Sequence, residues 1–76
     1  MPYEVEKALL ESGATDAVVF GYDTVYAEVV GNVDMDSLKS KLAYYKMPKI
    51  FTVDAIKRKG QGKINRKDLL TFYNLD

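Results

Sequence analysis

Two short runs rich in Val, Tyr and Phe fill residues 16–33, and a polar break at residues 22–24 separates them. β-Branched and aromatic residues favour strands, and two such runs joined by a short polar break are typical of a β-hairpin. Gly21 and Gly31 are expected to mark a strand end or a bulge. These runs constrain the chain to a fold built around a sheet.

A helix is predicted before this hairpin, over roughly residues 3–12, from the helical spacing of its apolar positions. Pro2 precedes the first turn and Gly13 follows the last, as is usual at helix ends. The apolar positions i, i+3, i+4 and i+7 are Val5, Ala8, Leu9 and the aliphatic part of Ser12.

A second helix is predicted to open at Asp34, whose carboxylate can accept hydrogen bonds from the first free amides. Leu38, Leu42 and Tyr45 follow at i, i+4 and i+7 and are expected to form its apolar face. Pro48 is expected to end this helix, because proline biases the preceding residue away from the α conformation.

A third strand is predicted at about residues 49–55 from its alternating pattern, and a short last helix at roughly residues 66–74. Asn65 resembles an N-cap for that helix, and Asp68 lies favourably near its N-terminus. The residues expected to form its apolar face are Leu69, Leu70, Phe72 and Tyr73.

The predicted order is α-β-β-α-β-α. One hairpin, one crossover strand and about three helices packed on the small three-stranded sheet give an α+β fold. The 76 residues form a single domain, residues 1–76, which is too small to enclose a large substrate pocket and keep a core. The six tyrosines are interpreted as packing residues that cover the sheet.

The composition excludes several kinds of chemistry. The chain has no cysteine and no histidine, which excludes disulfides, thiolate catalysis and Ser-His-Asp triads, and we predict no metal site. No apolar run approaches the ~20 residues needed to span a bilayer, and the start lacks the basic region of a signal peptide. We therefore expect a soluble, cytoplasmic protein with no membrane partner.

The charges are distributed unevenly along the chain. Residues 1–36 contain eight acids and one base, a net charge of −7, whereas residues 37–76 contain ten bases and three acids, a net charge of +7. Such asymmetry indicates either an anionic ligand or partner for the second half, or attraction between the two halves.

Six of the bases lie between Lys57 and Lys67. A P-loop is excluded because Ile64 follows Gly-Lys where Ser or Thr is required. A dinucleotide fingerprint is disfavoured because Asn65 stands where its third glycine is needed. Binding of nucleic acid is a further interpretation, against which stands the pI near 6.2. Two further interpretations of this segment stay open. It is a solvated surface, or its flexible Gly-Gln-Gly stretch carries Lys63 to an anionic site on another surface.

Three pieces of the chain, in order, are similar to motifs of one family: PYEVEKALLESGATDAVVFG, SLKSKLAYYKMPKIFTVDAI and GQGKINRKDL. Together they resemble the small C-terminal subdomain, or lid, of the adenylate-forming superfamily. This superfamily includes acyl-CoA synthetases, adenylation domains of nonribosomal peptide synthesis and luciferases. The resemblance covers nearly the whole chain.

By this resemblance Lys63 is the catalytic and nucleotide-contacting residue, which meets the carboxylate substrate and the nucleotide while acid and ATP form acyl-adenylate. Gly62 lets the loop bend, and Arg66 supports the last helix. The resemblance implies ATP with Mg²⁺, bound mainly by a large domain. In this chain Lys57, Lys59, Gly60 and Gln61 stand where the family usually has prolines, which predicts a more flexible loop.

The resemblance also implies partners. The first is a large N-terminal adenylation domain, in cis or in trans, and the acceptor would be coenzyme A or an acyl or peptidyl carrier protein. The chain is not expected to be active alone. The alternative function is a non-catalytic interaction module on the same fold, and the third is nucleic-acid binding through the basic loop.

Overall fold

The computed structural model describes residues 2–76, so Met1 of the predicted domain lies outside the described residues. The elements are α1 (Pro2–Glu11), β1 (Asp16–Phe20), β2 (Tyr26–Val30), α2 (Met35–Lys41), a 3₁₀ helix η1 (Tyr44–Lys46), β3 (Lys49–Thr52) and α3 (Arg66–Phe72). Apart from the short 3₁₀ helix, the order and the α+β class are as predicted. In the part of the chain that is described, no helix is long and apolar enough to cross a membrane.

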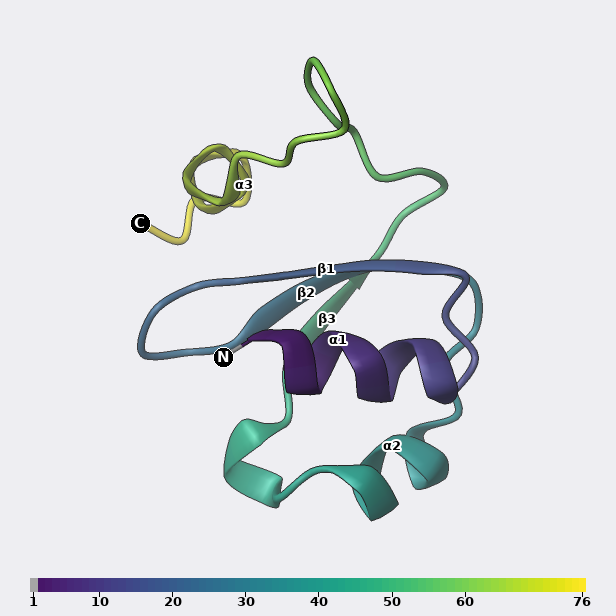
Figure 1. Ribbon diagram of the computed structural model, residues 1–76. Coiled ribbons are helices and arrows are strands. Elements are labelled where there is room, and N and C mark those ends of the chain that lie inside the picture. The colour runs from purple at the N-terminus through teal and green to yellow at the C-terminus, as the bar shows by residue number, and fades with distance from the viewer. Residues whose placement is uncertain (1) are drawn as a thin grey trace.

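The sheet has the order β1-β2-β3. β1 and β2 form the predicted antiparallel hairpin, with Phe20 opposite Tyr26 at the turn end. β3 runs parallel to β2, with Ile50 opposite Ala27. The chain therefore crosses over between β2 and β3, and α2 and η1 lie in this crossover (Figure 1).

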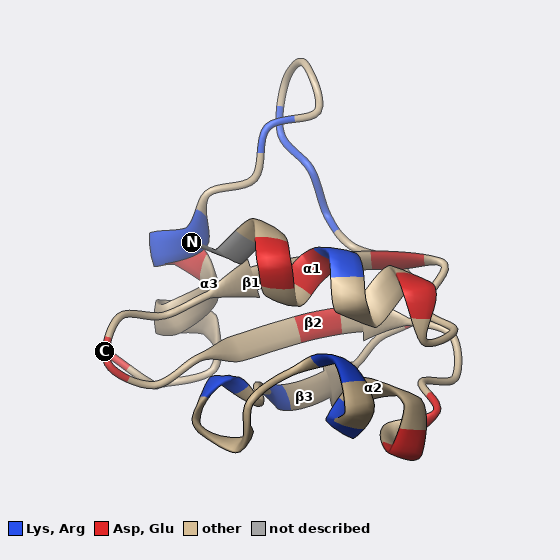
Figure 2. Cartoon of the chain, turned by 60° about the horizontal axis from the view of Figure 1, so that its bottom comes forward, with Lys and Arg blue, Asp and Glu red and all other residues tan. Residues whose placement is uncertain are grey.

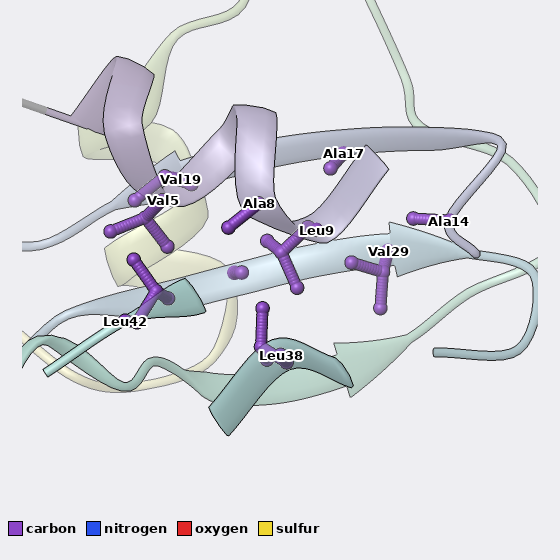
Figure 3. Packing of buried hydrophobic residues seen from close by; sticks show 10 residues of the cluster. Val5, Ala8, Leu9, Ala14, Ala17, Val19, Val29, Leu38 and Leu42 are labelled. Atoms are coloured by element: carbon purple, nitrogen blue, oxygen red, sulfur yellow. The ribbon is translucent and has the colours of Figure 1, made fainter. Parts of the chain in front are cut away.

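Two helices, α1 and α2, cover one face of the sheet and enclose an aliphatic core (Figures 1 and 3). Leu9 of α1 and Leu38 of α2 are fully buried there, and alternate residues of the strands point toward them. The strand residues of this core are Ala17, Val19, Ala27 and Val29. Burial of this apolar surface is the main force that holds the sheet and the two helices together.

The opposite face of the sheet is aromatic and lies under α3 (Figure 1). Phe20, Tyr26 and Phe51 project from the three strands, and Tyr73 at the end of α3 stacks on Phe51 with ring centroids 4.0 Å apart. Glu28 is buried on this face and accepts a hydrogen bond from the Tyr73 hydroxyl. The two faces of the sheet thus differ in chemistry as well as in the helices that cover them.

The second helix is shorter than predicted. Asp34 caps it as expected, accepting from the amides of Asp36 and Ser37, but α2 ends at Lys41 and Leu42 is extended with φ −127° and ψ 140°. Leu42 still reaches the core, so it fills its predicted place without continuing the helix. The prediction that Pro48 ends the helix is therefore wrong, because the chain must leave the axis of α2 to begin β3.

The tyrosines are less buried than the packing interpretation requires. Tyr26 and Tyr73 belong to the aromatic face, but four others are largely exposed, so that interpretation is wrong for them. These are Tyr3, Tyr22, Tyr44 and Tyr45. The prediction that Tyr45 continues the apolar face of the second helix is wrong, because α2 ends at Lys41 and Tyr45 lies in η1.

The last helix and the third strand also end earlier than predicted. β3 stops at Thr52, and α3 stops at Phe72, where a left-handed Asn74 with φ 60° turns the chain. The amide of Leu75 bonds the carbonyl oxygen of Leu70 at 2.8 Å, in the pattern of a Schellman motif. Leu70 is buried as predicted, whereas Phe72 is 74% exposed and does not belong to the core.

Candidate functional site

The basic segment forms an arm, residues 57–64, that projects from the α3 side of the sheet as the topmost loop of Figure 1. Ile56, just before the arm, is buried and holds its first end against the body of the domain. Asn65 holds the other end, since its side chain accepts hydrogen bonds from the amides of Lys67 and Asp68 and caps α3 as predicted. The arm is therefore fixed at both ends.

The tip of the arm is a narrow hairpin. Lys59 and Lys63 exchange two backbone hydrogen bonds, of 2.7 and 2.9 Å, across the turn Gly60-Gln61-Gly62. Gly62 has φ +83°, a left-handed conformation that side chains disfavour, and a Cβ atom at Gly62 would meet nothing within 4 Å. The turn is thus shaped by local backbone chemistry, and it places Lys63 directly after the bend.

Lys63 is exposed at the second strand of this small hairpin. Among residues 2–76 the ion pairs of the arm use Arg58 and Lys59, and Lys63 takes part in neither. Its ammonium group is therefore presented to solvent on a defined backbone rather than neutralised by the domain's own acids.

Arg66, the predicted support residue, is the first residue of α3. Its Nε donates a hydrogen bond of 2.8 Å to the carbonyl oxygen of Val19 in β1. This bond ties the start of α3 to the edge of the sheet, three residues after Lys63. The structure thus brings Gly62 and Lys63 together at the tip, while Arg66 acts at the root and contacts β1.

Arg58 was not singled out from the sequence, although it links the arm to the sheet. Its guanidinium donates hydrogen bonds of 2.6 and 2.8 Å to the two carboxylate oxygens of Asp16, at the start of β1. These hydrogen bonds are the main reason that the pKa of Asp16 lies below its usual value. A general signal for such a pair was present in the opposite charges of the two halves of the chain.

Attraction between the two halves is visible in the arrangement of charge. Acids gather on α1, and bases on the crossover, β3 and the arm (Figure 2). Lys46 pairs with Glu4 at 2.9 Å and Arg58 with Asp16 at 2.6 Å, so each pair joins the acidic half to the basic half. Part of the basic segment is thereby used within the domain, which leaves less of it for a polyanion.

No cluster of three or more acids, histidines or cysteines suited to a metal ion occurs within residues 2–76. The chemistry that the arm offers is therefore that of a cation: Lys63 can contact an anionic group, and the turn beside it can adjust the position of the ammonium.

Comparisons with known proteins agree with this fold. No family model matches the sequence, and no curated protein matches it significantly. Solved structures of adenylate-forming enzymes do match, with TM-scores of 0.69 to 0.79. The resemblance to the small domain of the adenylate-forming superfamily is thereby confirmed.

Three of these structural neighbours define the likeness. Apo MatB from Rhodopseudomonas palustris is 28% identical over 95% of this chain and 18% of its own, with a TM-score of 0.79. O-succinylbenzoate coenzyme A synthetase (MenE) from Bacillus subtilis is 32% identical over 93% of this chain and 17% of its own, with a TM-score of 0.72. Mycobacterium tuberculosis fatty acyl CoA synthetase is 25% identical over 92% of this chain and 17% of its own, with a TM-score of 0.69.

A structure of MatB with bound ATP also matches, at 27% identity over 97% of this chain, with a TM-score of 0.75. The chain spans less than a fifth of the length of each of these structures. The neighbours are adenylate-forming acyl-CoA synthetases, and the match corresponds in size to one small domain of such an enzyme.

Proposed function

We propose that this chain, residues 1–76, is the C-terminal lid domain of an acyl- or aminoacyl-adenylate-forming ligase. Its task is to deliver Lys63 to the ATP and carboxylate site of a large domain, in cis or in trans. The observation that carries the proposal is the position of Lys63: an exposed lysine outside the domain's ion pairs, on a narrow hairpin anchored at both ends. The likeness to acyl-CoA synthetases supports the reaction class.

Lys63 would act through its charge. A carboxylate oxygen would attack the α-phosphorus of ATP, and the bond to the β-phosphate would break with release of pyrophosphate. Negative charge spreads over the oxygens around this phosphorus, and an ammonium held nearby stabilises it without giving up a proton. The arm suits this task because the body of the domain anchors both of its ends. Its tip stands clear of other atoms, since a Cβ atom added at Gly62 would meet nothing within 4 Å. Gly62 sets the bend, and Arg66 secures the root of the arm on β1.

ATP and Mg²⁺ would be held mainly by the large domain. An exposed lysine fits a nucleotide phosphate, and MatB, a neighbour of this fold, binds ATP in one of its structures. Within residues 2–76 there is no acidic cluster to hold the metal ion, so we assign the metal to the partner domain. The thiol acceptor would be coenzyme A or a phosphopantetheine carrier protein, and the chain alone would have no activity.

The test is acid-dependent exchange of pyrophosphate into ATP, measured with the large domain encoded beside this chain or captured with it. Lys63→Ala should lower the exchange rate by roughly two to three orders of magnitude, the scale for loss of a preorganised charge stabiliser. Lys67→Ala is the matched control, because Lys67 is an exposed lysine in the first turn of α3 and should leave the rate nearly unchanged. Equal rates for the wild type and Lys63→Ala would remove Lys63 from the mechanism.

A non-catalytic interaction module is the second candidate, and the exposed tyrosines favour it. Tyr44 and Tyr45 are 89% and 71% exposed and contact each other edge to face, which gives a partner an aromatic surface. On this alternative, binding to the large domain would fall in Tyr45→Ala and remain in Lys63→Ala, without any effect of the chain on exchange. Calorimetric titration of both variants separates the two functions.

A further inference from the structure

A groove of about 550 Å³ lies on the aromatic side of the molecule, between the sheet, the start of the arm and α3. Its walls are mainly apolar, and they come from β2, from the segment that follows β3 and from α3. Its lining includes Glu28, Asp54, Lys57, Leu69, Phe72 and Tyr73. Lys63 is not part of its lining, although Lys59 and Ile64 of the arm are.

Glu28 is the most deeply buried polar residue of the groove lining, with 7% of its surface exposed. The Tyr73 hydroxyl donates to Oε2 of Glu28, and residues 2–76 supply no further hydrogen bond to this carboxylate. No side-chain oxygen or nitrogen in that range is both shut off from solvent and without a partner. Solvent therefore has access to Oε1, and we take this access to be through the groove that Glu28 lines.

Tyr73, whose hydroxyl contacts this carboxylate, belongs to a group of aromatic rings. Tyr73 stacks on Phe51, which fixes its ring, and Phe72 meets Tyr73 edge to face at 4.9 Å between centroids. Phe72 is 74% exposed, so its ring is available to a ligand. A carboxylate beside aromatic rings attracts an organic cation, both by charge and through the electron-rich ring faces.

The charges of the lining leave room for a cation. Lys59 and Asp68 both line the groove and pair with each other at 2.7 Å, so they largely cancel. The remaining lining charges are Glu28, Asp54 and Lys57, a net charge of −1. Neither Lys57 nor Lys59 forms an ion pair with Glu28 within residues 2–76. A carboxylate in a mainly apolar wall without a cationic partner is a costly arrangement that a bound cation would relieve.

We infer that this groove binds a small aromatic or aliphatic primary amine. Its ammonium group would meet Oε1 of Glu28, and its apolar body would lie along Leu69 and Phe72. The volume lies within the range of small-molecule sites, and the mainly apolar lining with few polar groups is typical of them. This inference does not rest on the proposed adenylation function, because it uses neither Lys63 nor a partner domain.

The weak acidity of the Tyr73 phenol keeps its hydrogen bond to Glu28 in place. Burial and the hydrogen bond to Glu28 raise the pKa of Tyr73 to about 12. The phenol therefore remains a donor throughout the pH range in which primary amines carry a proton, and Oε2 stays engaged. The orientation of the carboxylate toward an arriving ammonium group is then the same across that range.

The experiment is an amide chemical-shift titration of the 76-residue chain with three phenyl-bearing probes of similar size and different charge. These are 2-phenylethylamine, 2-phenylethanol and 3-phenylpropanoate. The amine should shift the amides of the groove residues and bind at least about tenfold more tightly than the alcohol, which corresponds to about 1.4 kcal/mol. The propanoate should bind no better than the alcohol. Tighter binding of the alcohol or the propanoate would overturn the inference, as would shifts confined to other parts of the surface.

Three variants test the role of Glu28. Glu28→Gln should abolish the preference for the amine, whereas Asp54→Asn, which removes an exposed acid from the same groove, should change the affinity less than about threefold. Tyr73→Phe removes the hydrogen bond to Oε2 but leaves the Glu28 side chain in place, so it should retain the preference for the amine over the alcohol. An unchanged preference in Glu28→Gln would contradict the proposal. If Glu28→Gln fails to fold, loss of amine binding in Tyr73→Phe would contradict it instead.

A fourth probe distinguishes a free amine from a side chain of a partner protein. Arginine capped at both ends carries a guanidinium on a peptide-like body. We expect it to bind more weakly than 2-phenylethylamine, because it lacks the ring that would lie against Phe72. Tighter binding of the capped arginine would overturn the assignment to small amines and indicate a protein partner.

Discussion

Gly13 and Gly62 both have positive φ angles, but they lie in very different surroundings. A Cβ atom at Gly13, after α1, would come within 2.4 Å of the carbonyl oxygen of Asn32, whereas a Cβ at Gly62 would meet nothing within 4 Å. The first glycine belongs to the body of the domain, the helices and the sheet, and the second to the arm. In the body a residue is fixed by neighbours distant in sequence, and in the arm by backbone preferences nearby.

This difference separates stability from the chemistry of the arm. The body holds the fold through buried side chains such as Leu9 and Leu38, and these lie on the face of the sheet away from α3 (Figure 3). The arm adds two backbone hydrogen bonds and an exposed lysine. Changes in the arm should therefore affect function with little effect on folding, and changes in the body should do the opposite.

The largest effect is expected for Leu38→Ala. Leu38 is fully buried, and its truncation should lower the free energy of unfolding by about 2 to 5 kcal/mol through lost burial and a cavity. Ile64→Ala at the end of the arm is the matched control, and it should cost about 1 kcal/mol or less because Ile64 is only half-buried. Urea denaturation measures both, and similar losses would erase the distinction between body and arm.

The same substitution at the two glycines sharpens the comparison. Gly13→Ala should lower the free energy of unfolding by about 2 to 3 kcal/mol, since it adds a backbone clash to an unfavourable φ. Gly62→Ala meets no atom, and the exposed turn can relax, so about 1 kcal/mol or less is expected. The midpoints of thermal unfolding rank the stability of the two variants. A greater loss of stability for Gly62→Ala than for Gly13→Ala would show that the arm is packed against the body of the domain.

The smallest effect concerns the link between arm and body. Hydrogen bonds from Arg58 lower the folded-state pKa of Asp16, so the pair stabilises the fold above the unfolded-state pKa of about 3.9. That contribution is lost as the pH falls through the lower folded-state pKa. Asp16→Asn should therefore narrow the difference in urea midpoint between pH 7 and pH 3.

The shift should be small, because the side chains of Asp16 and Arg58 are each 36% exposed and water screens their charges. Asp23→Asn is the control, since Asp23 is an exposed acid in the hairpin turn and is absent from the ion pairs within residues 2–76. If both variants respond alike to pH, the hydrogen bonds of Arg58 do not hold the arm.

Features governed by local chemistry were predictable from the sequence. The two N-caps, Asp34 and Asn65, formed as expected because a side-chain oxygen needs only the amides of the next turn. Gly21 and Gly31 follow the last residues of β1 and β2, as their place between apolar runs indicated. The exposed position of Lys63 directly after the Gly60-Gln61-Gly62 turn also follows from its neighbours in sequence.

Features that depend on the approach of distant segments were not predictable in this way. Phe72 has helical spacing, yet only the position of α3 on the sheet decides that Leu70 is buried and Phe72 exposed. Glu28 lies in a strand as a charged residue of an otherwise apolar run, and nothing local indicates that Tyr73 covers it. The groove beside Glu28 was missed for the same reason.

The hydrogen bond from Arg66 to Val19 has a consequence for self-association. β1 is an edge strand, and an unpaired carbonyl oxygen on such an edge invites the strand of another molecule. Arg66 occupies this oxygen. At the opposite edge β3 is only four residues long, follows Pro48, which has no amide hydrogen, and begins with a charged lysine. Both edges therefore offer less than a free strand does to the strand addition by which sheets grow into aggregates.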